Sequence, residues 1–274
     1  MTQVRGQATA DFSFAAIRHL LIDMDGVLYR GAQPLPAASA FIAFLRQRSV
    51  SFRLVTNNAT LTPEQYVAKL QDMRIEATPE EIFTSSLATA RYLKAAGQAG
   101  KRAFVIGEEG IRQALFDVGM NIVDENPEWV VVGLDRGLTY VRLAAAALAL
   151  ESGAHFLGTN PDTSFPDERG LVPGAGAILA ALTATTGMQP TVIGKPEPLM
   201  FEQALQDLGG NYQDTVMLGD RLDTDILGAQ RVRLATILVL TGVSSRADVQ
   251  STGIHPSAIV QDLVALMQEW DADS

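Results

Sequence analysis

Two carboxylates follow an apolar run near the start of the chain. The segment "LLIDMDG" places Asp23 at the end of a run typical of a buried strand, and Asp25 follows two positions later. On an extended backbone both side chains point the same way, so each charge raises the pKa of the other unless a cation lies between them. Mg²⁺ suits such a pair because it prefers carboxylate, carbonyl and water oxygens and accepts phosphate at a remaining position. The pair indicates a metal and phosphate site, although the segment taken alone also fits an ordinary turn.

The ends of other apolar runs carry polar side chains as well. In open α/β sheets ligands bind beyond the carboxyl ends of the strands, so groups at several strand ends converge where the strands are neighbours. Three acids within six residues repel one another unless something binds them, and Asp223 among them is also placed to cap the helix that follows. The groups expected to converge with the first pair are Thr56, Asn57 and Asn58 after "RLV", Lys195 after "TVIG", and Asp220 with Asp225 after "TVMLG".

These residue types together predict phosphoryl transfer, which needs positioning and charge neutralisation more than elaborate covalent chemistry. Asp23 is the candidate nucleophile, since a carboxylate can form an aspartyl-phosphate and divide hydrolysis into two easier steps. Asp25 is the candidate acid for the leaving oxygen and base for the attacking water. Asp220 is the expected third oxygen donor to the metal. Thr56 with the amides after it binds phosphate oxygens, and Lys195 neutralises the charge of the transferred group.

The elements that must position these side chains have the pattern of an α/β protein. Short runs rich in Val, Ile and Leu alternate with turn residues and helix-length segments, which indicates βα units and mainly parallel sheets. The expected helices include 37–47, 63–71 and 198–208, with Thr62 as the N-cap before Pro63. The segment 158–176 is dense in turn residues and predicts a long loop between a strand and a helix. Its glycines at 174 and 176 favour close helix packing over anion binding.

Composition limits the classes of partner. The 274 residues exceed what one hydrophobic core usually organises, and 47% of them are apolar. The formal charge of −10 argues against nucleic acid and anionic membranes as partners. Cysteine is absent, which excludes disulfides and thiolate chemistry. The start of the chain lacks the apolar core of a signal peptide, and no apolar run approaches the roughly 20 residues of a membrane span. We expect a cytoplasmic protein that binds neither nucleic acid nor membrane.

The motifs in this order resemble those of the haloacid dehalogenase superfamily. "DMDGVLY", "VTNN", "GKP" and "GDRLDTD" match its four motifs, and further segments such as "FTSSLATARYL", "GTNPD" and "LVLTGV" are similar to the NagD-like branch of phosphatases. The resemblance covers nearly the whole chain. It implies a Rossmann-like core with a parallel sheet, formed by residues 1–85 and 191–274, and an inserted α/β cap domain of the C2 type at residues 86–190.

The resemblance also implies roles for the motif residues. Asp23 is the nucleophile and a metal ligand, and Asp25 is the acid and base that gives its backbone carbonyl to Mg²⁺. Asp220 is a metal ligand, and Asp225 supports it without binding the metal directly. Thr56, Asn57, Asn58 and Lys195 bind phosphate, and Lys195 also orients the nucleophile. Dehalogenases of the superfamily lack the second aspartate, so Asp25 favours a phosphatase.

The cap is expected to select the substrate. A lid of this size indicates small phosphomonoesters and a closed state that excludes water. The candidates to contact the substrate are Arg136, Asn160, Asp162 and Arg169. Related enzymes often dimerise through this cap, so a homodimer is a further expectation.

Two other classes remain open alongside a Mg²⁺-dependent phosphatase. A phosphomutase on the same scaffold would return the phosphoryl group to its substrate, and a non-catalytic receiver-like module would sense phosphate with similar residues. Receivers are at most about half this length, and they have no need of a second carboxylate such as Asp25. The open substrates are phosphoglycolate, 4-nitrophenyl phosphate, pyridoxal phosphate, and sugar or nucleotide monophosphates.

Overall fold

The computed structural model describes residues 12–167 and 170–273, which form two compact units. The first unit holds the described residues up to Thr56, then Val67–Ile82, then those from Phe201 onward, and the second holds Asn57–Tyr66 and Phe83–Met200. The predicted domains, 1–85 with 191–274 and 86–190, differ from these units at residues 57–66 and 191–200 among others, and they stay a prediction.

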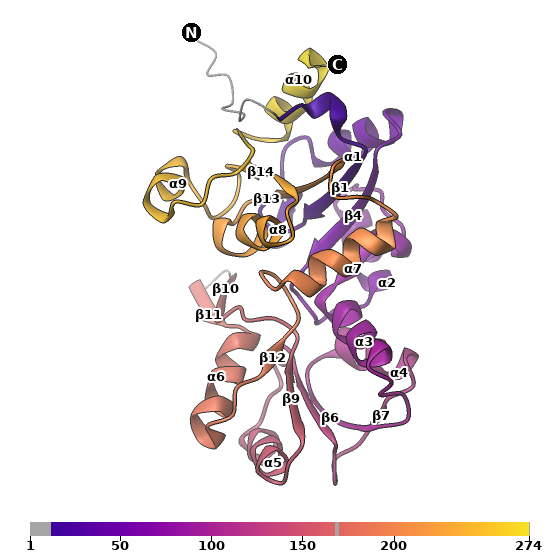
Figure 1. Cartoon of the computed structure of the whole chain (residues 1–274), viewed down its shortest axis with the longest axis vertical. Coiled ribbons are helices and arrows are strands. Elements are labelled where there is room, and N and C mark those ends of the chain that lie inside the picture. Colours follow the sequence, from indigo (N-terminus) through magenta and orange to yellow (C-terminus); the bar gives the residue numbers. More distant parts are fainter. Residues whose placement is uncertain (1–11, 168–169, 274) are drawn as a thin grey trace. The chain divides into compact units, whose positions relative to one another are not determined.

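The first unit is built on a sheet in the strand order β15-β14-β13-β1-β4-β5, of which Figure 1 labels β14, β13, β1 and β4. Its strands pair in parallel from β15 through β14, β13 and β1 to β4. The strands are β1 (His19–Asp23), β4 (Ser51–Thr56), β5 (Ile82–Thr84), β13 (Thr215–Gly219), β14 (Ala235–Val239) and β15 (Ala258–Val260). Because β1 lies between β13 and β4, Asp23 and Thr56 end neighbouring strands and Asp220 directly follows the third.

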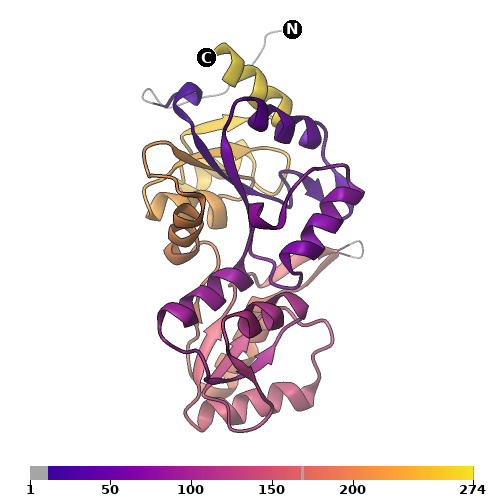
Figure 2. The ribbon, with the colours of Figure 1, turned by 90° about the vertical axis from the view of Figure 1, so that its right-hand side faces the viewer.

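Helices and short turns connect these strands. The helices are α1 (Ala38–Gln47), α2 (Pro63–Asp72), α7 (Pro198–Leu208), α8 (Leu227–Arg231), α9 (Arg246–Thr252) and α10 (Leu263–Ala272). A two-stranded ribbon of β2 (Tyr29–Arg30) and β3 (Gln33–Pro34) follows β1, the 3₁₀ turns are η1 (Phe14–Ala16) and η2 (Pro79–Glu81), and a π-turn, η3 (Leu222–Ile226), precedes α8. The helix α10 packs against η1 and α1, and Figure 2 shows it in yellow beside the indigo start of the described chain.

The helix starts expected at Pro63 and Pro198 are confirmed, whereas the helix expected from residue 37 begins one residue later, at Ala38. The Thr62 hydroxyl accepts the backbone N–H of Gln65 at 3.3 Å, while the Gln65 side chain accepts the backbone N–H of Thr62 at 2.9 Å. This reciprocal pair is a capping box, and Pro63 takes the first helical position, where its missing N–H costs nothing. Pro198 likewise opens α7, which has the bounds expected from the sequence.

The second unit has a parallel sheet of its own, in the order β12-β9-β8-β6-β7. Its strands are β6 (Arg102–Ile106), β7 (Asn121–Ile122), β8 (Trp129–Val132), β9 (His155–Gly158) and β12 (Thr191–Val192), and its helices are α3 (Ser85–Ala95), α4 (Glu109–Asp117), α5 (Tyr140–Glu151) and α6 (Ala175–Thr186). Alternate residues of β6, β8 and β9 pack with α5 and α6 in one core cluster that includes Phe104, Val130 and Leu179. The central strands are buried on both faces, which explains their unbroken apolar sequence.

The long loop predicted over residues 158–176 is wrong in its second half. Strands β10 (Ser164–Asp167) and β11 (Gly170–Pro173) pair there as an antiparallel hairpin. Apolar residues on both strands, among them Phe165 opposite Val172, supply the cross-strand contacts that the density of turn residues obscured in the sequence. The expected close packing of the glycines before and within α6 is confirmed: a Cβ at Gly174 would lie 2.3 Å from the Asp162 carbonyl oxygen, and one at Gly176 would lie 2.2 Å from that of Pro161.

None of the helices within residues 12–167 and 170–273 combines the length and the apolar character needed to cross a membrane.

Candidate active site

Three buried carboxylates meet at the carboxyl edge of the first sheet. One oxygen from each of Asp23, Asp220 and Asp225 lies within 4.8 Å of the others, and the three side chains are 8%, 1% and 1% exposed. Asp23 ends β1, Asp220 follows β13, and Asp225 comes from the π-turn η3. The convergence expected from parallel neighbouring strands is therefore present for these three acids.

The backbone around Asp220 is arranged to hold its carboxylate in place. Its Oδ2 accepts the N–H of Val243 at 2.7 Å, and its carbonyl oxygen accepts the N–H of Ser244 at 3.0 Å. A Cβ built on Gly242 or on Gly26 would lie 1.8 Å or 2.5 Å from the same Oδ2. Only glycine allows both chain segments to approach the carboxylate this closely, and Gly26 also needs its φ of +86° for the turn after β1.

The cluster has the donor chemistry of a site for a hard divalent cation. Three carboxylates buried this close together repel one another unless a cation neutralises them. Oxygen donors favour Mg²⁺ over softer metals. Asp225 is fixed by the backbone N–H of Arg221, which donates to its Oδ2 at 3.1 Å, so it is placed to support the other two. Asp23, Asp220 and Asp225 thus fit a magnesium ion, and the assignment of Asp23, Asp25 and Asp220 as its ligands stays a prediction.

Asp25 lies in the turn beyond β1 and has a different environment. Asp25 is exposed, and its backbone forms an isolated β-bridge with that of Tyr29 in the turn that follows. Partial burial of the carboxyl group raises its pKa, and the charge of Lys69 is the largest opposing influence. A raised pKa is what a group needs in order to carry a proton near neutral pH and give it away.

The remaining motif residues divide between the two units. Thr56 is buried at the end of β4 in the first unit, whereas Asn57, Asn58 and Lys195 belong to the second. The strand before Lys195, β12, pairs with β9 in the second sheet rather than with β1. The placement of Lys195, Asn57 and Asn58 against Asp23 therefore stays a prediction.

A hydrogen-bonded network ties the motif loops of the second unit together. The Asn57 side-chain amide donates to the Lys195 carbonyl oxygen and to the Asp162 carboxylate, each at 2.9 Å. The buried Asn160 donates to the Asn57 carbonyl oxygen at 2.7 Å and accepts the N–H of Asp162 at 3.1 Å. A Cβ at Gly194 would lie 2.5 Å from the Thr159 carbonyl oxygen, so the chain before Lys195 needs glycine there. These contacts fix the three loops, and they use the Asn57 side-chain N–H groups within the protein.

The cap candidates have distinct surroundings. Arg136 forms a bidentate pair with Glu108, Nε to Oε1 at 2.8 Å and Nη2 to Oε2 at 2.7 Å, while the Arg136 backbone N–H donates to Oε1 at 3.1 Å. Asn160 and Asp162 belong to the loop network described above. Arg169 lies outside the described residues. The contact of these residues with substrate stays a prediction.

The pair between Glu108 and Arg136 is expected to make stability depend on pH. Burial raises the pKa of Glu108, but the hydrogen bonds from Arg136 outweigh it and hold the pKa below its usual value of about 4.3. The stabilisation is therefore complete above about pH 5 and is lost as the pH falls through the lowered pKa. Glu108→Gln should cost about 1 kcal/mol or less at pH 7, because the pair is partly solvated.

Thermal unfolding of wild type and Glu108→Gln at a series of pH values tests this expectation. The difference in melting temperature should shrink as the pH is lowered from 5. A difference that is the same at every pH would mean that packing, not charge, is lost.

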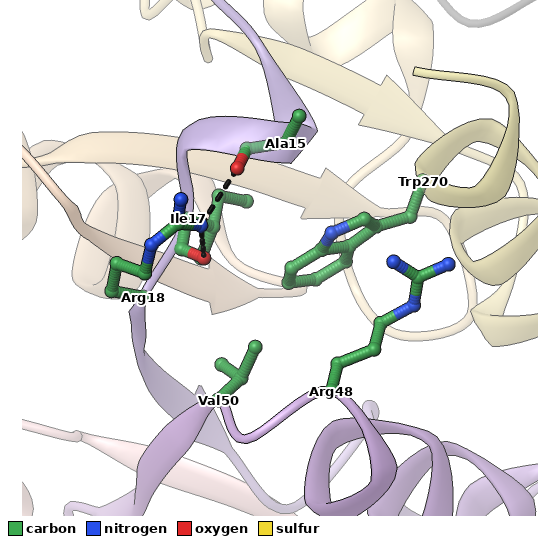
Figure 3. Close-up of a pocket in the computed structure, with 6 residues that line it drawn as sticks. All are labelled: Ala15, Ile17, Arg18, Arg48, Val50 and Trp270. Atoms are coloured by element: carbon green, nitrogen blue, oxygen red, sulfur yellow. Dashed lines mark hydrogen bonds between the residues drawn. The ribbon is translucent and has the colours of Figure 1, made fainter. Parts of the chain in front are cut away.

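A cavity lies at the opposite edge of the first sheet. It has a volume of about 280 Å³, and its lining residues precede β1 and β4 or come from α10, as Figure 3 shows for Ala15, Ile17, Arg18, Arg48, Val50 and Trp270. Arg18 donates to the Ala15 and Ile17 carbonyl oxygens at 2.7 and 3.1 Å, and Arg48 pairs with Asp271. Both guanidinium groups bond to the chain itself, and the cavity is remote from the carboxylates within this unit.

Sequence reasoning missed one charged residue that lies beside the Asp25 turn. Lys69 lies on α2 with its Nζ 4.0 Å from the centroid of the Tyr29 ring, next to the Asp25 turn. In the sequence it resembles any lysine of an amphipathic helix. No spacing rule connects it to the motifs, because helix α2 folds back on the β1 turn only through tertiary packing.

Comparison with known proteins identifies the family. A family model described as haloacid dehalogenase-like hydrolase matches residues 20–121, and a related model of the same hydrolases matches residues 192–266. An acid sugar phosphatase of Staphylococcus aureus is 44% identical over 92% of this chain and 97% of its own. The chain belongs to the haloacid dehalogenase-like hydrolases.

Solved structures define the branch more closely. A double mutant of the thermostable NPPase from Geobacillus stearothermophilus is 45% identical with a TM-score of 0.84, covering 90% of this chain and 97% of its own. NagD from E. coli K-12 is 34% identical with a TM-score of 0.85, over 90% and 97%. The 4-nitrophenylphosphatase from Thermotoga maritima is 32% identical with a TM-score of 0.89, over 93% and 98%. These matches place the chain in the NagD-like branch and confirm the predicted class of enzyme, a phosphatase of this family.

Proposed function

We propose that this hydrolase is a Mg²⁺-dependent phosphatase that cleaves small phosphomonoesters through an aspartyl-phosphate on Asp23. The observation that carries the proposal is the cluster of Asp23, Asp220 and Asp225 at one sheet edge, with Asp25 in the turn two residues beyond the first. The names of the relatives, acid sugar phosphatase and 4-nitrophenylphosphatase, support the same reaction.

In the first half-reaction an Asp23 oxygen attacks phosphorus and forms a P–O bond. The bond from phosphorus to the leaving oxygen breaks, and its electron pair remains on that oxygen, which takes the proton of Asp25. Thr56 and the chain amides at Asn57 and Asn58 bind the phosphoryl oxygens, and Lys195 neutralises their charge. Mg²⁺, when bound by Asp23, Asp220 and the Asp25 carbonyl, supplies further positive charge to the phosphoryl group.

In the second half-reaction water replaces the alcohol. Asp25, now a carboxylate, takes a proton from the water as the water oxygen bonds to phosphorus. The P–O bond to Asp23 breaks, which restores the Asp23 carboxylate and releases inorganic phosphate. Asp25 ends protonated, as it began, so each half-reaction prepares the other.

A phosphate-release assay over a panel of metabolites with Mg²⁺ present tests the proposal. The panel holds sugar phosphates, phosphoglycolate, pyridoxal phosphate, nucleoside monophosphates and 4-nitrophenyl phosphate. We expect free phosphate from 4-nitrophenyl phosphate and from at least one metabolite. A phosphomutase would instead yield a rearranged ester with little free phosphate, and a non-catalytic receiver-like module does not fit the family match.

We also propose that the enzyme is cytoplasmic and forms a homodimer through its cap. The lack of cysteine and the charge of −10 fit a reducing cytoplasm and a small-molecule substrate rather than nucleic acid. Helix α5 exposes apolar side chains at one face, with Tyr140, Val141 and Leu148 being 83%, 75% and 64% exposed. Exposed apolar patches of this kind often mark interfaces. Sedimentation velocity measures whether two copies of the chain associate in solution.

A further inference from the structure

Lys69 rests against the turn that carries Asp25. Its Nζ lies 4.0 Å from the centroid of the Tyr29 ring, a cation–π distance, and the Tyr29 side chain is only 2% exposed. Tyr29 in turn closes the Asp25 turn, because it bridges Asp25 and its carbonyl oxygen accepts the N–H of Gly26 at 2.7 Å. The ammonium group is thus seated on the residue that shapes the Asp25 turn, and all four residues belong to the first unit.

The charge of Lys69 also acts on Asp25, to whose turn Lys69 is joined by Tyr29. Burial lowers the pKa of Lys69, and the Asp25 charge opposes that effect. The converse holds for Asp25, whose pKa is raised by burial and lowered most by Lys69, then by the Gly31 N–H and by Arg30. Arg30 also donates to the Thr241 carbonyl oxygen, which anchors its guanidinium group elsewhere. A half-buried lysine loses hydration, and the face of the Tyr29 ring together with the charge of Asp25 compensates part of that loss.

We propose that Lys69 is a positioning residue for Asp25 that acts through Tyr29: its contact with the Tyr29 ring holds the turn that presents the Asp25 carboxyl group to the leaving oxygen. The proposal rests on the proposed function, in which Asp25 is the general acid. Lys69 exchanges no proton in the reaction. The proton moves from Asp25 to the leaving oxygen, which keeps the electron pair of the broken P–O bond, and the ammonium group only fixes where the donor stands.

Leaving groups of different basicity test this role. 4-Nitrophenolate is weakly basic and departs without help, whereas the alkoxide of a sugar phosphate is strongly basic and needs the proton of Asp25. We expect Lys69→Met to lower kcat/KM for a sugar phosphate by about tenfold or more, and to change kcat/KM for 4-nitrophenyl phosphate by less than about threefold. The comparison uses kcat/KM because it includes steps only up to departure of the leaving group, so the second half-reaction, common to both esters, does not enter.

Three variants control the experiment. Asp25→Asn should show the same selectivity with a larger loss, Lys69→Arg should recover part of the activity on the sugar phosphate, and Lys94→Met on the exposed surface of α3 should change neither ester. Lys69→Gln provides a second neutral variant should the methionine disturb the fold, and melting temperatures identify the folded proteins.

The outcomes separate this inference from the function on which it rests. Equal losses on both esters, or no loss on either, in a folded neutral variant would overturn the role of Lys69, provided that Asp25→Asn remains selective. An Asp25→Asn variant that loses both esters equally in kcat/KM would instead overturn the assignment of Asp25 as general acid. A wild-type protein that releases no phosphate from any ester would contradict the proposed function itself.

Discussion

Asp23→Asn is expected to abolish turnover, lowering kcat by about 10⁴-fold or more. The amide oxygen of asparagine is a far weaker nucleophile than a carboxylate, so the P–O bond to residue 23 does not form. The substitution also removes one of the three charges that face the proposed magnesium ion. Phosphate release from the best ester of the panel measures the loss, and the mass of the acid-quenched protein shows whether a phosphoryl group accumulates in wild type and not in the variant.

The fold should survive this change, because asparagine has the shape of aspartate and the site loses a repulsion. Asp214→Asn is the matched control: Asp214 precedes β13 at the opposite edge of the sheet and pairs with His19 at 3.0 Å. That variant should lose a little stability and keep its kcat. Substantial activity in a pure Asp23→Asn protein would rule out the covalent route, and attack by water on the substrate would replace it.

The core of this site could be predicted because it follows from local pattern and sheet geometry. Asp23 and Asp220 come directly after apolar runs, parallel strands place such positions at one edge, and β13 lies beside β1. The helix starts at Pro63 and Pro198 could also be predicted from the sequence, because capping and proline preferences depend on only a few neighbouring residues.

What could not be predicted depends on pairing between distant segments. The motif strand before Lys195 looks in sequence like any other, yet β12 pairs with β9 of the second sheet. The buried side chain of Asn160 donates to the Asn57 carbonyl oxygen, a contact between distant loops that no local pattern in the sequence indicates. Lys69 was not predicted either, because its contact with Tyr29 is visible only once helix α2 is folded against the turn after β1.

Asp220→Asn is the second substitution with a large expected effect, because it removes a metal ligand while preserving the surrounding contacts. The asparagine side-chain oxygen still accepts the N–H of Val243, so the loop beyond β14 keeps its anchor. Loss of one charge from three should weaken Mg²⁺ binding by more than about 100-fold, given that even supporting residues of metal sites contribute 10- to 100-fold. The Mg²⁺ concentration for half-maximal phosphate release should rise accordingly, and EDTA should inactivate wild type reversibly.

Stability supplies a measurement that does not depend on turnover. Mg²⁺ stabilises whatever folded state binds it, so the melting temperature of wild type should rise with Mg²⁺ concentration and that of Asp220→Asn should hardly change. Without metal the variant should melt at or above the wild-type temperature, because two buried carboxylates repel less than three. Asp223→Asn is the matched control from the same segment, since Asp223 is exposed, pairs with Arg221 at 2.8 Å and lies outside the carboxylate cluster. The melting temperature of Asp223→Asn should rise with Mg²⁺ as much as that of wild type. An equal rise in Asp220→Asn would mean that Mg²⁺ binds elsewhere and that the carboxylate cluster is not its site.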